Sequence, residues 1–383
     1  MTFDVNDREC QDKVDLISSR MMIPRMITFM LTNVCSTKCC YCYADTDTKV
    51  NKLIPTERVV EIIQDAKRVG VYNIGLIGGE VFLHPNWDII LKAIVDNGFL
   101  LDTISTKIPI TEKIISKLKD TNFQGGIQIS LDTLFVEHAM KTLHVGKNYI
   151  KKMKAGIELL EKSSIKYNVE TVLTKTTASI ENINKLFEFF SKKKNVKHWE
   201  VRVAMFSNNK DEENFIGIKS DSNTLNELYK YIDENIIPKS SFPINTARQE
   251  LENKYFSSDT GSSSFKGAKC SALNEHFFIL PDGKVTICEQ LYWNPIFIIG
   301  NMNYQGVMEV WNSDRVLQLL QLKQQDINDN SACKSCKLFD DCFKVSRNRC
   351  WSDIIKAYGY KNWDFPDPRC VHAPKMKFKI SYK

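Results

Sequence analysis

The segment CSTKCCYCY at residues 35–43 carries cysteines with the spacing to bind an iron–sulfur cluster. Cys35, Cys39 and Cys42 form a C-x3-C-x2-C pattern directly after the apolar run MITFML. Cys40 adjoins Cys39, and because adjacent residues in a tight loop tend to point apart, we expect Cys40 to be a bystander. Three thiolates on a cubane cluster would leave one iron without a protein ligand. An open position of this kind is where chemistry takes place.

A structural zinc site is the alternative interpretation of these cysteines. Zinc prefers four closed ligands, usually as two cysteine pairs far apart in the sequence. Here the three ligands lie in one loop, and no second pair follows in the same part of the chain. The pattern therefore favours an iron–sulfur cluster with an open iron.

A second set of cysteines lies near the C-terminus. Residues 270–370 hold seven of them: Cys270, Cys288, Cys333, Cys336, Cys342, Cys350 and Cys370. Disulfides are rare in cytosolic proteins, so clustered cysteines there indicate metal ligands or redox groups. Zinc ions that staple a small domain with a thin core are one interpretation, and iron–sulfur clusters are the other.

The elements that position the first cysteines alternate between two patterns from residue 26 to about residue 206. Six β-rich runs are each followed by a segment with helical periodicity. In TERVVEIIQDAKRVG the apolar residues share one face, Pro55 precedes the pattern and Gly70 ends it. Repeated strand–helix units predict an α/β fold, a partial (β/α)6 TIM-like barrel with a parallel sheet. The C-terminal ends of its strands would carry the chemistry.

The rest of the chain divides by composition. We predict an N-terminal extension at 1–25, the partial barrel at 26–206, a polar connector with one or two helices at 207–265, and a small domain at 266–383. In that last domain HFFILPDGKVTICEQ predicts a β-hairpin, and MEVWNSDRVLQLLQ predicts one further helix.

Bulk composition excludes several classes of protein. The chain has 383 residues, 43% hydrophobic and 26% charged, the balance of an ordinary globular protein. Its polar N-terminus lacks the apolar stretch of a signal peptide, and no run approaches the roughly 20 apolar residues of a membrane span. We therefore expect a cytoplasmic protein without a membrane partner. The net charge of +6 is mild and does not indicate a nucleic-acid partner.

The first cysteine pattern, with Tyr41 before its last cysteine and a strand before the loop, resembles the radical SAM superfamily. The resemblance implies a 4Fe–4S cluster whose open iron is chelated by S-adenosylmethionine (SAM). It also implies reductive cleavage of SAM to methionine and a 5′-deoxyadenosyl radical, which abstracts a hydrogen atom from the substrate.

The resemblance extends to the ends of the next strands. IGLIGGE resembles the family element that holds the SAM amino group, and Ser130 resembles a serine that binds the methionyl carboxylate. Relatives often pair that carboxylate with an arginine in the following helix, where this chain offers lysines, Lys151 among them. The SAM-binding residues that the resemblance implies are Tyr41, Gly78, Gly79, Glu80, Ser105, Thr106, Ser130, Asp132 and Lys151.

The C-terminal cysteines resemble the SPASM extension of radical SAM enzymes, through C-x12-G-x4-C followed by C-x2-C-x5-C. This implies two auxiliary 4Fe–4S clusters, and three clusters in all. By family connectivity the first would be held by Cys270, Cys288 and Cys350, and the second by Cys333, Cys336, Cys342 and Cys370. The chain departs from the family where seven residues, instead of three, separate Cys342 from Cys350. Seven thiols are one short of two fully ligated cubanes, so we expect an iron of the first auxiliary cluster to lack a cysteine ligand.

The resemblance implies a peptide- or protein-modifying enzyme, a maturase of a ribosomally made peptide that performs crosslinking, epimerisation or oxidation. Glu289 directly follows Cys288, where sulfatase-maturing relatives carry an aspartate base, so it is the candidate catalytic base. The implied partners are a peptide substrate, a reductant such as flavodoxin or ferredoxin, and a separate leader-peptide-binding protein. A sulfatase-maturing enzyme, a small-molecule dehydrogenase and a non-catalytic electron-transfer or scaffold protein are the alternatives.

Overall fold

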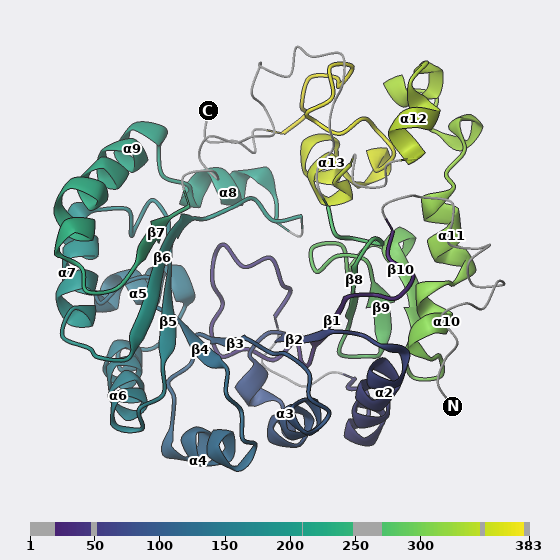
Figure 1. Cartoon of the computed structure of the whole chain (residues 1–383). Coiled ribbons are helices and arrows are strands. Elements are labelled where there is room, and N and C mark those ends of the chain that lie inside the picture. The colour runs from purple at the N-terminus through teal and green to yellow at the C-terminus, as the bar shows by residue number, and fades with distance from the viewer. Residues whose placement is uncertain (1–19, 47–51, 209, 248–269, 345–348, 379–383) are drawn as a thin grey trace.

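The computed structural model describes residues 20–46, 52–208, 210–247, 270–344 and 349–378. Its strands form one long arc made of two five-stranded sheets, in the orders β10-β9-β8-β1-β2 and β3-β4-β5-β6-β7. A bridge between Asn73 and Leu100 lies where the two sheets meet. Figure 1 shows the strands curving around an interior into which the segment after β1 projects.

All six strands predicted between residues 26 and 206 are present. They are β1 (Met26–Met30), β2 (Asn73–Ile77), β3 (Thr103–Thr106), β4 (Gly126–Ser130), β5 (Tyr167–Leu173) and β6 (Val196–Val203). The pairs β1–β2, β3–β4, β4–β5 and β5–β6 are parallel, which confirms the partial barrel. The strand C-termini therefore meet at one end of the arc.

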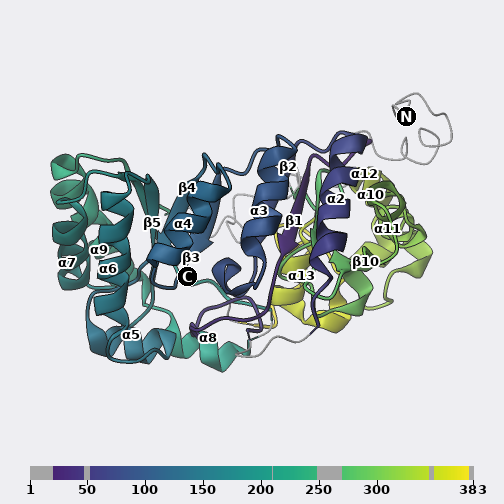
Figure 2. The ribbon, with the colours of Figure 1, turned by 90° about the horizontal axis from the view of Figure 1, so that it is seen from below.

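Helices cover the outside of these strands, as Figure 2 shows for α2, α3 and α4. The helices between β1 and β6 are α2 (Thr56–Val69), α3 (Trp87–Asp96), α4 (Glu112–Asp120), α5 (Val136–Leu143), α6 (Tyr149–Lys162) and α7 (Ile180–Phe190). Helix α2 buries the apolar face that its periodicity predicts, including Val59, Ile62 and Ile63. It ends at Gly70, whose φ of 94° is a left-handed cap that glycine adopts without strain.

The predicted connector contributes to the sheet, which the sequence did not indicate. It holds α8 (Glu212–Ile218), α9 (Ser222–Tyr231) and the short strand β7 (Ile244–Thr246). Strand β7 pairs in parallel with β6, from Trp199–Ile244 to Val201–Thr246. The barrel wall thus extends past residue 206. The part of the connector at 248–269 lies outside the described residues.

The predicted hairpin is present and completes the other end of the arc. Strands β8 (His276–Ile279) and β9 (Lys284–Thr286) are antiparallel, and β10 (Ile298–Asn301) pairs with β9. Strand β8 also pairs in parallel with β1, from Met26–His276 to Phe29–Ile279. The two cysteine-bearing parts of the chain therefore share one sheet.

The single helix predicted from MEVWNSDRVLQLLQ is wrong, because the chain breaks there into α10 (Val307–Trp311) and α11 (Asp314–Leu320). Ser313 lies between them, and its side chain accepts a hydrogen bond from the Val316 backbone N–H, which starts a new helix. Helices α12 (Phe339–Lys344) and α13 (Trp351–Tyr358) follow. Among the described residues, no helix has the length and apolar character needed to cross a membrane.

Candidate active site

The loop after β1 is held in place by backbone hydrogen bonds to the end of α5. The N–H groups of Lys38 and Cys40 donate to the carbonyls of Leu143 and Thr142, both at 2.9 Å. Within the loop, the Thr37 hydroxyl lies 3.2 Å from the Cys35 sulfur and 3.5 Å from that of Cys39. The loop geometry is thus fixed largely by backbone hydrogen bonds and by Thr37.

Gly78 and Gly79 bring the loop against the end of β2. The Gly79 N–H donates to the Thr32 carbonyl at 2.6 Å. A Cβ atom at Gly78 would lie 2.7 Å from the Thr32 oxygen, and one at Gly79 would lie 2.4 Å from the Val34 oxygen. Glycine is required here because the backbone leading into Cys35 passes too close for any side chain. The family resemblance implies that Gly78 and Gly79 contact SAM, and the structure shows that both also face protein backbone.

A cavity of about 450 Å³ collects most of the predicted site residues. It is bounded by the cysteine loop, the ends of β2 to β6 and the chain after Cys288. Its lining includes Cys35, Cys39, Tyr41, Cys42, Gly78, Gly79, Glu80, Ser105, Thr106, Ser130 and Glu289. Three thiols, several carboxylates and several hydroxyls in one cavity form a donor set that fits a three-cysteine cluster with SAM beside it.

Glu80 is the buried carboxylate of this cavity, with 3% of its surface exposed. Its Oε2 accepts the Lys107 N–H at 3.0 Å, and its Oε1 accepts the Phe82 N–H at 3.4 Å. Burial raises the pKa of Glu80 to about 7. An ammonium group placed in the cavity would favour the ionised form, which is the chemistry that the SAM amino group would supply.

Burial also affects the thiols of Cys39 and Cys40. It raises the pKa of Cys39 to about 12 and that of Cys40 to about 11. A thiolate at Cys39 therefore requires a compensating positive charge, which a metal centre would supply.

Lys107 is a site residue that sequence reasoning missed. Its Nζ lies 3.1 Å from both carboxylate oxygens of Asp132 and donates to the Tyr41 hydroxyl at 2.8 Å. The Tyr41 hydroxyl in turn donates to Asp132, whose other oxygen accepts the Val172 N–H at 3.0 Å. Asp132 is thus occupied by protein groups and does not line the cavity, whereas Lys107 does.

The structure does not bring Lys151 to this cavity. Helix α6 turns Tyr149, Ile150 and Met153 inward, which leaves Lys151 exposed on the opposite face. The cationic side chains that line the cavity are Lys107 and Arg202, and Arg202 lies 3.6 Å from Glu170. This position does not support the expected pairing of Lys151 with the SAM carboxylate.

The seven C-terminal cysteines fall into two groups. The Cys270 and Cys350 thiols are hydrogen-bonded to each other, and this contact, burial and nearby groups that include Cys288 raise the pKa of Cys350. Burial and the neighbours Cys342 and Cys370 raise the pKa of Cys333 to about 11. Burial, Cys342 and Cys336 likewise raise the pKa of Cys370. These neighbours are compatible with the connectivity that the family resemblance implies, which stays a prediction.

Glu289 connects this region to the cavity. Its carboxylate lies 3.6 Å from the Cys288 sulfur, and both Glu289 and Gln290 line the cavity of the first cysteines. Among the described residues, no three His, Cys, Asp or Glu side chains are close enough to hold a single metal ion. The assignment of individual cysteines to clusters remains a prediction.

Comparison with known families identifies both parts of the chain. Residues 29–190 match the Radical SAM superfamily, and residues 270–337 match the iron–sulfur cluster-binding domain named SPASM. The chain contains a radical SAM domain followed by a SPASM domain. These two domains imply SAM and 4Fe–4S clusters as cofactors, while the number of clusters stays a prediction.

Curated relatives match mainly the radical SAM domain. A probable GTP 3',8-cyclase of Methanococcus maripaludis is 31% identical over 135 residues, which cover 35% of this chain and 44% of that protein. A GTP 3',8-cyclase of Helicobacter pylori is 26% identical over 247 residues, 63% of this chain and 73% of that protein. The chain thus spans less than half the length of the first of these relatives.

Solved structures resemble the radical SAM/SPASM chain over nearly its whole length. Streptococcus suis SuiB bound to S-adenosylmethionine has a TM-score of 0.67 at 20% identity, and covers 96% of this chain and 81% of its own. The protein anSMEcpe with bound AdoMet has a TM-score of 0.60 at 16% identity, and the match covers 90% of this chain and 93% of anSMEcpe. At these identities the likeness shows the fold.

Proposed function

We propose that this radical SAM/SPASM protein cleaves SAM reductively and abstracts a hydrogen atom from a peptide, which is then crosslinked, epimerised or oxidised. The observation that carries the proposal is the shared cavity, in which Glu289 of the SPASM part faces the cysteines and Glu80 of the barrel. A peptide substrate is supported by two structural neighbours, since SuiB has been solved with the precursor peptide SuiA and anSMEcpe with a peptide.

The test is anaerobic reconstitution with iron and sulfide, followed by SAM and dithionite. We expect 5′-deoxyadenosine, and a mass change in a short peptide encoded next to this gene. GTP is the matched control substrate, because curated relatives are named GTP 3',8-cyclases. Turnover of GTP without any change in a peptide would overturn the proposal. Absence of 5′-deoxyadenosine under all conditions would favour an electron-transfer or scaffold role.

Different barrel residues would contact different parts of SAM. Glu80 would accept from the SAM amino group, Ser130 would bind its carboxylate, and Tyr41 would lie beside its adenine. Cys35, Cys39 and Cys42 would hold the cluster that SAM completes. Lys107 supplies a positive charge in the same cavity, in place of Lys151.

The first auxiliary cluster would be held by Cys270, Cys288 and Cys350, which leaves one iron without a cysteine ligand. The proximity of these three thiols supports this assignment. Cys10, the one further thiol that could in principle complete this cluster, lies outside the described residues. A crystal structure of the loaded protein with eight protein ligands on the auxiliary clusters would contradict the proposal.

Glu289 would act as the base that removes a proton from the oxidised substrate. Its place in the cavity, beside Cys288, supports the role. Electrons would come from a reductant such as flavodoxin or ferredoxin. If Glu289→Gln forms product at the wild-type rate while deoxyadenosine formation is unchanged, Glu289 is not the base.

A further inference from the structure

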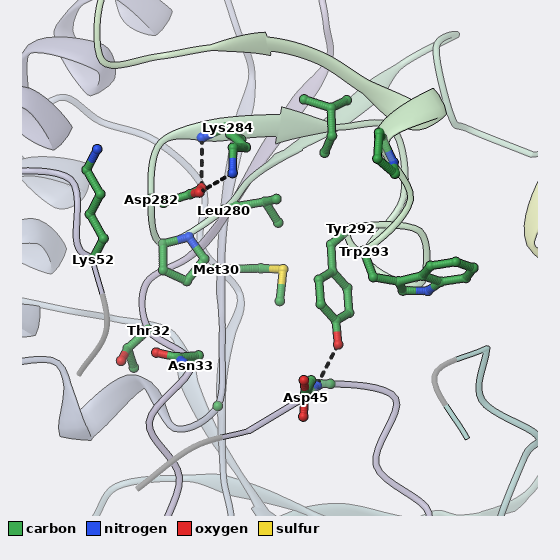
Figure 3. Close-up of a pocket in the computed structure, with 15 residues that line it drawn as sticks. Met30, Thr32, Asn33, Asp45, Lys52, Leu280, Asp282, Lys284, Tyr292 and Trp293 are labelled. Atoms are coloured by element: carbon green, nitrogen blue, oxygen red, sulfur yellow. Dashed lines mark hydrogen bonds and ion pairs between the residues drawn. The ribbon is translucent and has the colours of Figure 1, made fainter. Parts of the chain in front are cut away.

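A second cavity of about 730 Å³ lies beside the first, between the cysteine loop and the β8–β9 hairpin (Figure 3). It is formed by the ends of β1 and β8, the hairpin turn and the chain before β10. The lining residues used below are Met30, Asn33, Asp45, Gly79, Leu280, Tyr292, Trp293 and Ile298. The proposed chemistry of SAM and the three cysteines does not use this cavity.

One wall of the cavity is apolar, and the charged side chains Asp45, Lys52, Asp282 and Lys284 also line the cavity. Met30 and Leu280 come from the C-terminal ends of two adjacent parallel strands, and Figure 3 shows them in the middle of the cavity wall with Tyr292 beside them. Ile298 and Trp293 add further apolar surface from the SPASM part. A cavity of this size that combines an apolar wall with polar and charged groups is suited to an amphipathic ligand such as a peptide segment.

One polar group of the lining has no partner within the described part of the chain. The side-chain oxygen of Asn33 is buried and accepts no hydrogen bond. A buried acceptor without a donor is unfavourable, and such atoms are rare in native structures. A ligand that donates an N–H or O–H group would satisfy it.

Three chain segments run from the lining of the first cavity into the lining of the second. Gly79 lines both cavities. The cysteine loop passes from Cys42 and Tyr43 in the first cavity to Asp45 in the second, and the SPASM chain passes from Glu289 to Tyr292. The Tyr292 hydroxyl accepts the Asp45 N–H at 2.7 Å, which ties two of these segments together. The cavities are therefore neighbours that one extended ligand can reach.

We propose that the second cavity binds an apolar side chain of the substrate peptide, close in sequence to the residue that reacts. That side chain would lie against Met30, Leu280 and Ile298, and a backbone N–H of the same segment would donate to Asn33. The inference rests on the proposed peptide substrate and specifies which part of it is recognised. A peptide fits because it combines an apolar group, an N–H donor and a chain that continues into the first cavity.

The test uses the full-length, reconstituted protein with SAM and a displayed library of random peptides as the probe. Peptides enriched on the wild type are synthesised, and their affinities are measured for Ile298→Glu, Asn33→Leu and Ile89→Glu. Ile298 is half-buried at the cavity, whereas Ile89 is 51% exposed on α3 and serves as the matched control. Melting temperature and iron content are recorded for every variant.

We expect enriched peptides to share an apolar residue. Ile298→Glu should weaken their binding about tenfold or more, because a carboxylate replaces apolar contact area. Asn33→Leu should weaken peptide binding about fivefold, because the acceptor for the peptide N–H is lost. The melting temperature should not fall, because this acceptor has no partner in the free protein within the residues that the structure describes. Ile89→Glu should bind like the wild type. If Ile298→Glu does not fold, the peptide affinity of Asn33→Leu alone tests the proposal.

The remaining outcomes separate the two proposals. Enriched peptides that bind all three variants as tightly as the wild type would overturn the cavity assignment and leave the peptide function intact. Equal weakening in Ile89→Glu would overturn it as well. If no peptide is enriched although SAM is cleaved, the proposed peptide function fails and the inference fails with it.

Discussion

Lys107 and Asp132 form a buried ion pair whose loss should be costly. The Lys107 side chain is 14% exposed and that of Asp132 is 1% exposed. Lys107→Met would leave the Asp132 carboxylate without its cation in a dry environment. Removing one partner of such a pair typically costs about 3–5 kcal/mol of stability. We expect a loss of this size in the free energy of unfolding, measured by denaturant titration at pH 7.

The double variant Lys107→Met/Asp132→Asn separates the cost of an unpaired charge from the value of the pair. Replacing both charges often costs little, so the double variant should be more stable than Lys107→Met alone. If the double variant is the less stable of the two, the ion pair itself stabilises the fold and our account of Asp132 is wrong.

Glu80 should give the apoprotein a characteristic pH dependence. Its pKa is about 7 in the folded protein, against 4.5 for an unperturbed side chain, because it is buried. The folded protein therefore holds this proton more tightly than the unfolded chain does. Its contribution to the free energy of unfolding falls as pH rises between these values, by on the order of 3 kcal/mol. Glu80→Gln has no such proton, so it should gain stability relative to wild type from pH 5 to pH 8. A constant difference across this range would contradict the shift.

Single residues were predictable where a spacing pattern carries the information. Cys35, Cys39 and Cys42 were found from their spacing, and the structure places all three in the same cavity. Lys107 follows the third strand in the motif ISTK, but nothing local shows that its ammonium reaches Asp132 after the fourth strand. Lys151 was chosen from its position in the sequence, although the face of α6 that packs inward excludes it.

At the scale of elements, Gly79 couples the end of β2 to the cysteine loop. Gly79→Ala would place a Cβ 2.4 Å from the Val34 oxygen, so the loop must move away from β2. We expect the reconstituted variant to lose the iron of one cluster, about four atoms. Iron analysis and the spectrum of the reduced clusters measure this.

Gly217→Ala is the matched control, because a Cβ there meets nothing within 4 Å and the residue lies in α8. This change should leave iron content unaltered and stabilise the helix by roughly 0.5–1 kcal/mol. A full iron load in Gly79→Ala would show that the loop can relax without losing its cysteine geometry.

Elements with strong local patterns were predicted well. The six barrel strands are β-rich runs, and α2 has a one-sided apolar face between Pro55 and Gly70. Strand β7 was not predicted, because Ile244–Thr246 is only three residues long and none of them is fully buried. The break between α10 and α11 depends on the N-cap at Ser313. The apolar residues keep a helical spacing across this position, so the pattern alone predicted one helix.

At the scale of the whole molecule, the pairing of β8 with β1 joins the two domains and has no local signature. The hairpin was predictable from Pro281, Asp282 and Gly283, but its partner lies at the other end of the chain. Arg20 adds a second long-range link, since its Nε donates to the Leu273 carbonyl at 2.9 Å and its guanidinium stacks 4.2 Å from the Trp311 ring. Strands β1 and β2 of the barrel therefore lie in one sheet with β8, β9 and β10 of the SPASM part, and the two parts share a core.

This sharing predicts that the barrel does not fold without the SPASM part. A chain ending at residue 265 would lose β8 and expose the apolar surface of β1, which Phe277 and Ile279 complete with 0% exposure each. We expect no cooperative thermal transition for residues 1–265. In the full chain, Phe277→Ala should cost about 3–5 kcal/mol and shift one common transition, as followed by far-UV circular dichroism and by tryptophan fluorescence. Two separate transitions, or cooperative unfolding of the truncated chain, would show instead that the barrel is stable by itself and that β8 is an addition to a complete fold.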